Sequence, residues 1–189
     1  ALYSVGKYIT VLESDDELTA NACEEMFLCA QRTGADLIQG RTIVQNPNNL
    51  PQERIDVVVK LLTPYEKTSK GHDILRRTFV ERRYPTNVCG KLYARELMQN
   101  AFLHLQDVHT FMASDTLTFF VIAALANKCE TIQSNVYVYN YGLGITGRSR
   151  LSFDDFSKQC GQIDILPPLK RFAEGWKYIE EAYVVLEKK

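Results

Sequence analysis

The chain opens with a short apolar run followed by an amphipathic stretch. Residues 7–12, KYITVL, are nearly all apolar or β-branched, which predicts a strand with both faces buried, as in a parallel sheet. Residues 20–33 show apolar side chains at helical spacing, with Thr19 as the expected N-cap and Gly34 as the expected C-cap. The apolar face of that helix comprises Cys23, Met26, Phe27 and Ala30. Residues 35–40, ADLIQG, and the RTIV behind them predict a second strand, so the order strand–helix–strand indicates an α/β fold.

The middle of the chain continues this alternation. Residues 46–52 are a loop by composition, residues 63–71 are a second polar loop, and residues 55–62, IDVVVKLL, fit either a strand or a helix. Helices are then expected at residues 72–83, 94–101 and 113–128, and strands at residues 87–93 and 130–141. The inward face of the first of these helices is expected to comprise Ile74, Leu75, Phe79 and Val80.

The tail has a different pattern. Pro167 and Pro168 are expected to divide it into two helices. An apolar face at helical spacing, which docks on the body or on a partner, comprises Phe172, Trp176, Ile179 and Tyr183. We therefore assign residues 1–150 to an α/β domain and residues 151–189 to a C-terminal helical extension.

Composition limits the classes of protein that fit. A chain of 189 residues, 46% of them hydrophobic, is long enough for one substantial core. The net charge of -1 gives no basic excess for nucleic acid and no acidic excess of the kind that favours disorder. The five cysteines are scattered without a C-x-x-C pair, which is typical of buried thiols in a reducing compartment. No signal peptide is visible at the start, and the longest strongly apolar run, residues 119–126, is far shorter than the ~20 residues of a membrane span.

An acidic segment, LESDDEL at residues 12–18, lies between the first predicted strand and the first predicted helix. Its carboxylates fit a helix start, where unpaired backbone N–H groups favour negative charge. They also fit a site for Mg²⁺ or Mn²⁺ with a diphosphate, since ligands of open α/β sheets bind beyond the carboxyl ends of strands. The glycine and late glutamate of an EF-hand calcium loop are missing at the required offsets.

Two later segments carry further candidate residues. Asp115 precedes a strongly apolar helix and fits either an acid in the first turn, with Ser114 as N-cap, or a general base. Residues 87–98, NVCGKLYARELM, fit a strand–turn–helix with surface charge, or a site in which Lys91 and Arg95 face a phosphate or an acceptor.

Histidines and arginines give weaker indications. His72, His104 and His109 show no ligand spacing, so surface or supporting roles are expected. A cluster of arginines around one predicted helix comprises Arg76, Arg77, Arg82 and Arg83. Its default interpretation is a solvated face, and its alternatives are a phosphate-bearing acceptor or an anionic membrane surface.

The order of these segments resembles the inverting family-2 glycosyltransferases of the GT-A fold. Residues 6–18, GKYITVLESDDEL, are similar to that family's G-E-Y-I-x-F-L-D-S-D-D-x-L, and RTGADLIQG at residues 32–40 is similar to its T-G-A-D turn. GKLYARELM, residues 90–98, resembles N-K-L-Y-R-R-E-L-L, and SDTLTFF, residues 114–120, resembles an E-D pair before a long apolar helix. The resemblance extends to the closing strand and loop, residues 137–149, and so covers most of the chain.

The resemblance implies sugar transfer from a nucleotide-sugar donor to an acceptor hydroxyl, as a single displacement with inversion at the anomeric carbon. Glu13 takes the position near the nucleotide ribose. Asp15 takes the position that contacts the metal, Mg²⁺ or Mn²⁺, and Asp16 supports it. Asp115 takes the position of the base that deprotonates the acceptor. The remaining substrate-binding residues are Lys91 and Arg148.

The chain also departs from the family pattern. Glu13 replaces an aspartate, Ser114 replaces the glutamate of the E-D pair, and no histidine occurs in residues 140–150. Only twelve residues precede Glu13, so the βα units that hold the base and ribose in the family are missing. The predicted fold is therefore a truncated GT-A-like mixed sheet flanked by helices, with a C-terminal helical tail, and the chain alone is expected to be inactive.

Three functions follow from these observations. The first is a transferase in cell-surface polysaccharide biosynthesis, acting on a glycan or lipid-linked acceptor. The second is a noncatalytic glycosyltransferase-like domain that binds a glycan or a protein, and the third, a hydrolase with Glu13 and Asp115 as its carboxylate pair, has the least support. The transferase is expected in the cytoplasm with peripheral contact to the inner face of the membrane, with self-association through an open sheet edge and without a nucleic-acid partner.

Overall fold

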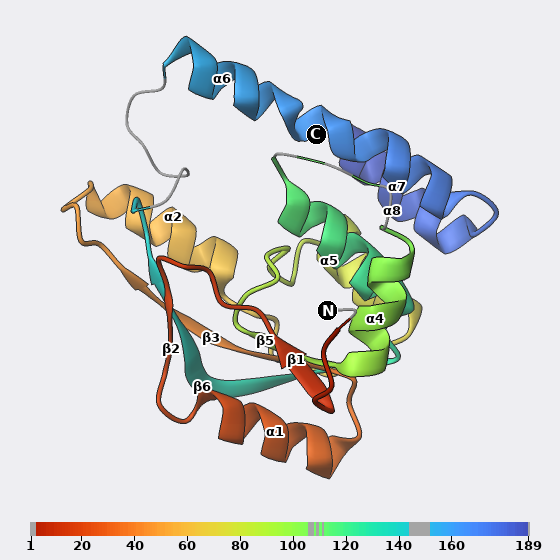
Figure 1. The fold of residues 1–189 in the computed structure, drawn as a ribbon, viewed down its shortest axis with the longest axis horizontal. Helices are drawn as coiled ribbons and strands as arrows, with labels where there is room; N and C mark the ends of the chain where they lie inside the picture. Colours follow the sequence, from red (N-terminus) through yellow and green to blue (C-terminus); the bar gives the residue numbers. More distant parts are fainter. Residues whose placement is uncertain (1–2, 106–107, 109, 111, 144–151, 189) are drawn as a thin grey trace.

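A mixed β-sheet forms the centre of the computed structural model, which describes residues 3–105, 108, 110, 112–143 and 152–188. The strands are β1 (Tyr8–Thr10), β2 (Glu17–Leu18), β3 (Leu37–Gln45), β4 (Ser69–Lys70), β5 (Lys91–Ala94) and β6 (Lys128–Asn140). In this described part the strand order is β1-β5-β3-β6-β2, with β4 on the other end of β6 (Figure 1). The long strands β3 and β6 run parallel, and the other pairs are antiparallel. The predicted mixed α/β body is confirmed.

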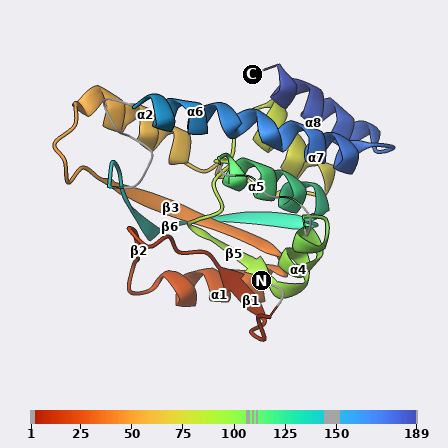
Figure 2. The same ribbon diagram turned by 45° about the horizontal axis from the view of Figure 1, so that its top comes forward.

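Helices cover both faces of this sheet. They are α1 (Ala22–Thr33), α2 (Gln52–Leu62), α3 (His72–Leu75), the π-helix η1 (Arg76–Val80), α4 (Arg95–Leu103), α5 (Ser114–Leu125), α6 (Phe153–Cys160), the 3₁₀-helix η2 (Gly161–Ile165), α7 (Leu166–Ala173) and α8 (Lys177–Glu187). Helix α1 lies on one face, whereas α2, α5 and α6 lie over the other (Figure 2). None of the helices in the described ranges is long and apolar enough to cross a membrane.

The core is thickest around α5. This helix is apolar on all sides, and it packs against α3, α4 and α7. Its Phe119 and Phe120 are fully buried, with Phe120 edge-on to Phe79 of η1 at 4.8 Å between ring centroids. The buried residues from Phe119 to Ala124 fix this helix in the core, and with it the position of Asp115 in the first turn.

Helix α1 differs in detail from its predicted form. Asn21, not Thr19, occupies the N-cap position, because the Thr19 hydroxyl donates instead to the backbone O of Asn135 in β6 at 2.7 Å. Gly34 ends the helix with φ of 64°, as predicted. The buried face comprises Ala22, Met26, Cys29 and Ala30. Phe27 is 43% exposed because it lies beside the sheet edge, where its ring meets Tyr8 edge-on at 5.9 Å.

The first strand is an edge rather than an interior strand. Tyr8 to Thr10 are half-buried and pair only with β5, antiparallel, within the described part of the sheet. The prediction of a strand at residues 7–12 is therefore confirmed, whereas its burial on both faces as in a parallel sheet is wrong. Self-association through this edge stays a prediction.

One ambiguous segment of the sequence and one predicted helix are both helical in the structure. Residues 55–62 belong to α2, with Ile55 buried. In residues 72–80, Ile74, Leu75 and Phe79 are buried as predicted, but a π-helical turn replaces the second half of the expected α-helix.

The tail breaks at a glycine and not at its proline pair. Pro167 and Pro168 lie in the first turn of α7, where the missing N–H groups would have had no helical partner. The chain turns instead at Gly175, with φ of 83°. Trp176 is consequently 58% exposed at the N-cap of α8, whereas Ile179 and Tyr183 are buried, and α8 packs on η1 and α3.

We predict that Gly40 of β3 is required for the close approach of β6. A Cβ atom at this position would lie 2.4 Å from a methyl carbon of Val136. Gly40→Ala should therefore lower the free energy of unfolding by about 1–3 kcal/mol, as measured by urea denaturation. Val136→Ala should recover part of that loss in the double variant, and Gly161→Ala, with ordinary contacts, should have little effect. Equal losses with and without the Val136 change would contradict this account.

Candidate active-site cavity

A cavity of about 330 Å³ opens between α2, the carboxyl half of β6 and the start of α5. Three carboxylic acids far apart in the sequence line it, namely Glu13, Asp16 and Asp115. Helix α2 supplies the apolar wall with Val58, Leu61 and Leu62. The rest of the wall includes Asn87, Cys89, Tyr137, Tyr139 and Tyr141. We call this space the acidic cavity.

Hydrogen bonds attach the acidic loop to β6. The carboxylate of Asp16 accepts from the Tyr137 hydroxyl at 2.8 Å and from the Asn140 backbone N–H at 2.9 Å. The Asn140 side chain donates to the backbone O of Asp15 at 2.8 Å. The Tyr137 oxygen also accepts from the Glu13 backbone N–H at 3.3 Å. These four contacts hold the loop after β1 at the end of β6, where Glu13 and Asp16 line the cavity.

The acids in this loop repel one another. Partial burial raises the pKa of Glu13, and the charges of Asp115, Asp15 and Asp16 raise it further. The Cys89 thiol lies 4.0 Å from Glu13 Oε1, and burial raises the pKa of this thiol to about 11, so it is a neutral donor. A cation bound near Glu13 would relieve the repulsion.

Asp115 lies in the first turn of α5, at the wall of the cavity. Ala113, with φ of 57°, occupies the N-cap position predicted for Ser114, which is the first residue of the helix. Burial raises the pKa of Asp115, while the Lys91 charge and a hydrogen bond with the Val88 backbone oppose that shift. The half-buried carboxylate is thus a stronger base than an exposed aspartate.

Lys91 lies behind the cavity rather than in it. The side chain has no exposed surface, its ammonium donates to the backbone O and to Oδ1 of Asn87, and it lies 4.6 Å from the Phe119 ring centroid. Burial lowers the pKa of Lys91 to about 8. The predicted contact between Lys91 and substrate therefore does not match its position, and the lysine acts on Asp115 and Asn87 instead.

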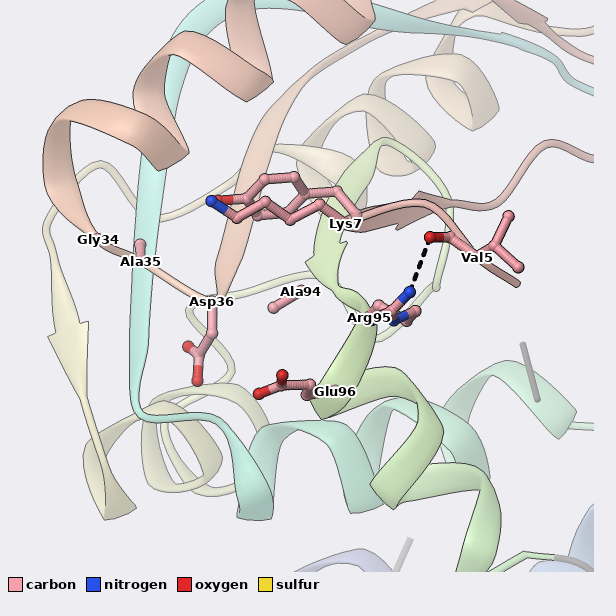
Figure 3. A pocket seen from close by; sticks show the side chains of 9 residues that line it. Val5, Lys7, Gly34, Ala35, Asp36, Ala94, Arg95 and Glu96 are labelled. Atoms are coloured by element: carbon pink, nitrogen blue, oxygen red, sulfur yellow. Dashed lines mark hydrogen bonds between the residues drawn. The ribbon is translucent and has the colours of Figure 1, made fainter. Parts of the chain in front are cut away.

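Other predicted site residues lie elsewhere. Asp15 is half-buried and does not line the acidic cavity, although it lies within electrostatic range of Glu13. Arg148 lies outside the described residues. Arg95 lines a separate pocket of about 360 Å³, where its guanidinium donates to the backbone O of Val5 at 2.7 Å (Figure 3). Asp36 and Glu96 lie in that same pocket.

Several residues of the cavity had no place in the sequence prediction. They are Asn87, Cys89 and Tyr137, and Asn140, which does not line the cavity, holds the Asp16 carboxylate through its backbone N–H. The alternation Y-V-Y-N-Y at residues 137–141 places three tyrosines on one side of β6, and that signal was available in the sequence. Asn87 and Cys89 could not be found in this way, because their loop reaches the cavity only through the packing of β5 against β3.

The donor set partly fits a divalent cation. No group of three or more His, Cys, Asp or Glu side chains in the described ranges is arranged to hold a metal. Mg²⁺, however, is usually bound by one or two protein carboxylates together with substrate phosphates. Asp16, with Asp15 beside it, meets that smaller requirement.

No family profile and no curated protein matches the chain. Solved structures of S. aureus TarS share its fold. The TarS crystal structure matches with a TM-score of 0.59 at 13% identity, covering 98% of this chain and 28% of that chain. TarS 1-349 in complex with UDP-GlcNAc matches with a TM-score of 0.59 at 12% identity, covering 95% of this chain and 47% of that one. The chain thus has a glycosyltransferase-like fold, and it spans only 28% and 47% of the length of these two TarS chains.

We predict that Lys91 gives the stability of the protein a distinct pH dependence. Between pH 8 and 10.5 the folded chain binds fewer protons at this position than the unfolded chain, so the free energy of unfolding rises with pH. Relative to Lys91→Met, the wild type should gain on the order of 3 kcal/mol across this window. Urea denaturation at several pH values measures the difference. Parallel curves for wild type and Lys91→Met would refute the assignment.

Proposed function

We propose that the chain is the catalytic-base and metal-binding part of an inverting sugar transferase that uses a nucleotide-sugar donor. The observation that carries the proposal is the meeting of Asp115 with Glu13 and Asp16 in one cavity. An acid is favoured in the first turn of a helix, but this preference does not explain why Asp115 faces a second acidic loop from near the start of the chain. The likeness to TarS, solved with UDP and UDP-GlcNAc, supports the donor class.

The proposed reaction is one displacement at the anomeric carbon. The acceptor hydroxyl gives its proton to the Asp115 carboxylate, its oxygen bonds to the anomeric carbon, and the bond from that carbon to the nucleoside diphosphate breaks. Inversion follows because attack and departure occur on opposite faces of the sugar. The Lys91 ammonium favours the ionised form of Asp115, so the base is ready to accept the proton.

The acidic loop would hold the departing diphosphate through a divalent cation. Mg²⁺ or Mn²⁺ bound at Asp15 and Asp16 would supply positive charge against the phosphates. Glu13 is assigned to the nucleotide ribose. The Tyr137 and Asn140 hydrogen bonds keep the loop in place, so this chain's own contribution is orientation of the leaving group.

The alternative is a noncatalytic domain of the same fold that binds a glycan or a protein partner. It is favoured by the replacement of the family's aspartate with Glu13 and of its glutamate with Ser114.

The transferase proposal also includes the family-2 assignment, a lipid-linked acceptor and peripheral membrane contact.

We predict that Asp115→Asn in the full-length protein keeps donor binding and loses turnover. The amide cannot accept the acceptor's proton, so turnover should fall by a factor of about 100–10,000. Calorimetry with UDP-GlcNAc measures binding, and release of UDP in the presence of acceptor measures turnover. Asp164→Asn, at an exposed position in η2, is the matched control. Normal turnover in Asp115→Asn would remove this residue from the mechanism and favour the noncatalytic domain.

We predict that the isolated chain binds UDP weakly and only with a divalent cation. The affinity should be ~millimolar with Mn²⁺ and should be lost in EDTA, because two carboxylates and water form a sparse site. Asp15→Asn should weaken binding, whereas Glu17→Gln, on the neighbouring strand β2, should not. Micromolar affinity in a calorimetric titration would show that the nucleotide site of the chain is complete.

A further inference from the structure

A second, larger pocket of about 920 Å³ lies beside the acidic cavity. It is bounded by the last turns of α2, by residues 82–87 after η1 and by the end of α8. The charged residues that line it are Lys60, Arg82, Arg83 and Lys188. We call it the basic pocket, because no described residue in its lining carries a negative charge.

The four cations of the basic pocket have no acidic partner in the part of the chain that the structure describes. Within the described ranges, none of them forms an ion pair. Elsewhere on the molecule, Arg76 pairs with Asp73 and Glu81, and Lys128 pairs with Glu130. Unlike Arg76 and Lys128, the four side chains that gather in the basic pocket have no neutralising acid beside them in the described ranges. Unpaired positive charge in a concave site attracts an anion.

The backbone after η1 holds two of these arginines in place. Arg82 has φ of 56°, which residues other than glycine rarely adopt. The next backbone N–H, that of Arg83, donates to the backbone O of Arg77 at 2.7 Å. The Arg83 guanidinium lies 5.7 Å from the Tyr65 ring centroid, which limits its movement without neutralising its charge. The pocket is thus partly preorganised.

The basic pocket and the acidic cavity share a wall. Leu61, Leu62 and Asn87 line both of them. A ligand that extends past these residues meets carboxylates on one side and cations on the other. An anionic group that is not bound to a divalent cation would be repelled by Glu13, Asp16 and Asp115, so its place is the basic pocket.

From this arrangement we infer that the basic pocket binds a phosphate group on the acceptor saccharide and thereby directs an acceptor hydroxyl toward Asp115. The inference rests on the proposed function and adds the chemical class of the acceptor. Phosphate is favoured because paired guanidinium groups match its oxygens in a bidentate geometry. The concave shape suits a discrete group, whereas a membrane surface calls for cations on an open face.

The test is binding of inorganic tripolyphosphate in EDTA, measured by calorimetry. Without a divalent cation the acidic cavity has no attraction for phosphate, so the signal reports the basic pocket alone. Arg82→Gly with Arg83→Gln should bind at least tenfold more weakly, and the glycine accepts the positive φ without strain. A second double variant, Lys60→Gln with Lys188→Gln, leaves that loop untouched and should also lose affinity. Glucose 6-phosphate should bind to the wild type more tightly than glucose does. To each double variant, glucose 6-phosphate should bind as weakly as glucose.

Arg76→Gln, which removes a cation already paired with two acids, is the control and should bind like the wild type. Unchanged affinity in both double variants would overturn the inference, as would an equal loss in Arg76→Gln. Binding to phosphatidylglycerol vesicles but not to tripolyphosphate would also overturn it, in favour of a membrane surface. None of these measurements uses a nucleotide-sugar donor or depends on turnover. A failure of the proposed transferase reaction would therefore be detected in the turnover experiment and not in these binding experiments.

Discussion

The Asp16 carboxylate is the contact on which the candidate site depends. Its two oxygens accept from Tyr137 and from the backbone of Asn140, and so join the loop after the first strand to the end of the last one. Hydrogen bonds to an ionised acceptor are about twice as strong as neutral ones, so this contact can hold a loop whose acids repel each other. Without it the loop would be held only by the Glu13 N–H contact with Tyr137 and the Asn140 side-chain contact with Asp15, so Glu13 would be less firmly placed relative to Asp115. The acidic loop at residues 12–18 therefore has a structural role, through the hydrogen bonds of Asp16, as well as the chemical role proposed for it.

The charged side chains around that contact form three separate groups. Carboxylates face the acidic cavity, the buried Lys91 ammonium lies behind them, and the cations of the basic pocket lie across the wall that the two spaces share. A buried lysine costs free energy unless a nearby acid and hydrogen bonds compensate for its desolvation. Asn87 and Asp115 supply part of that compensation, and in return the Lys91 charge opposes the rise that burial causes in the pKa of Asp115. Because the positive and negative charges nearly cancel, the formal net charge of -1 does not reveal this separation of acids and cations into different places.

The likeness to TarS concerns the path of the backbone. At 13% identity the shared fold does not carry residue roles across, so the case for transfer chemistry depends on the cavity itself. Three acids, a neutral thiol and a tyrosine-rich wall give that cavity a polar end and an apolar side under α2. Such a combination is typical of sites that hold a small ligand in one orientation.

The sequence by itself determined the strands and helices of the body, because periodic apolar residues leave few alternatives for burial. It also placed Glu13, Asp16 and Asp115 at the ends of elements, where ligands bind in α/β folds. Only the tertiary structure decided which polar groups meet. Lys91 follows a loop in a pattern that fits exposure, yet the strand pairing of β5 with β1 and β3 buries it completely. In the same way, Gly175 rather than the proline pair ends α7, because proline disrupts a helix only where its N–H is needed. Local pattern fixes which face of an element is apolar, but the partners of a polar side chain depend on segments far away in the sequence.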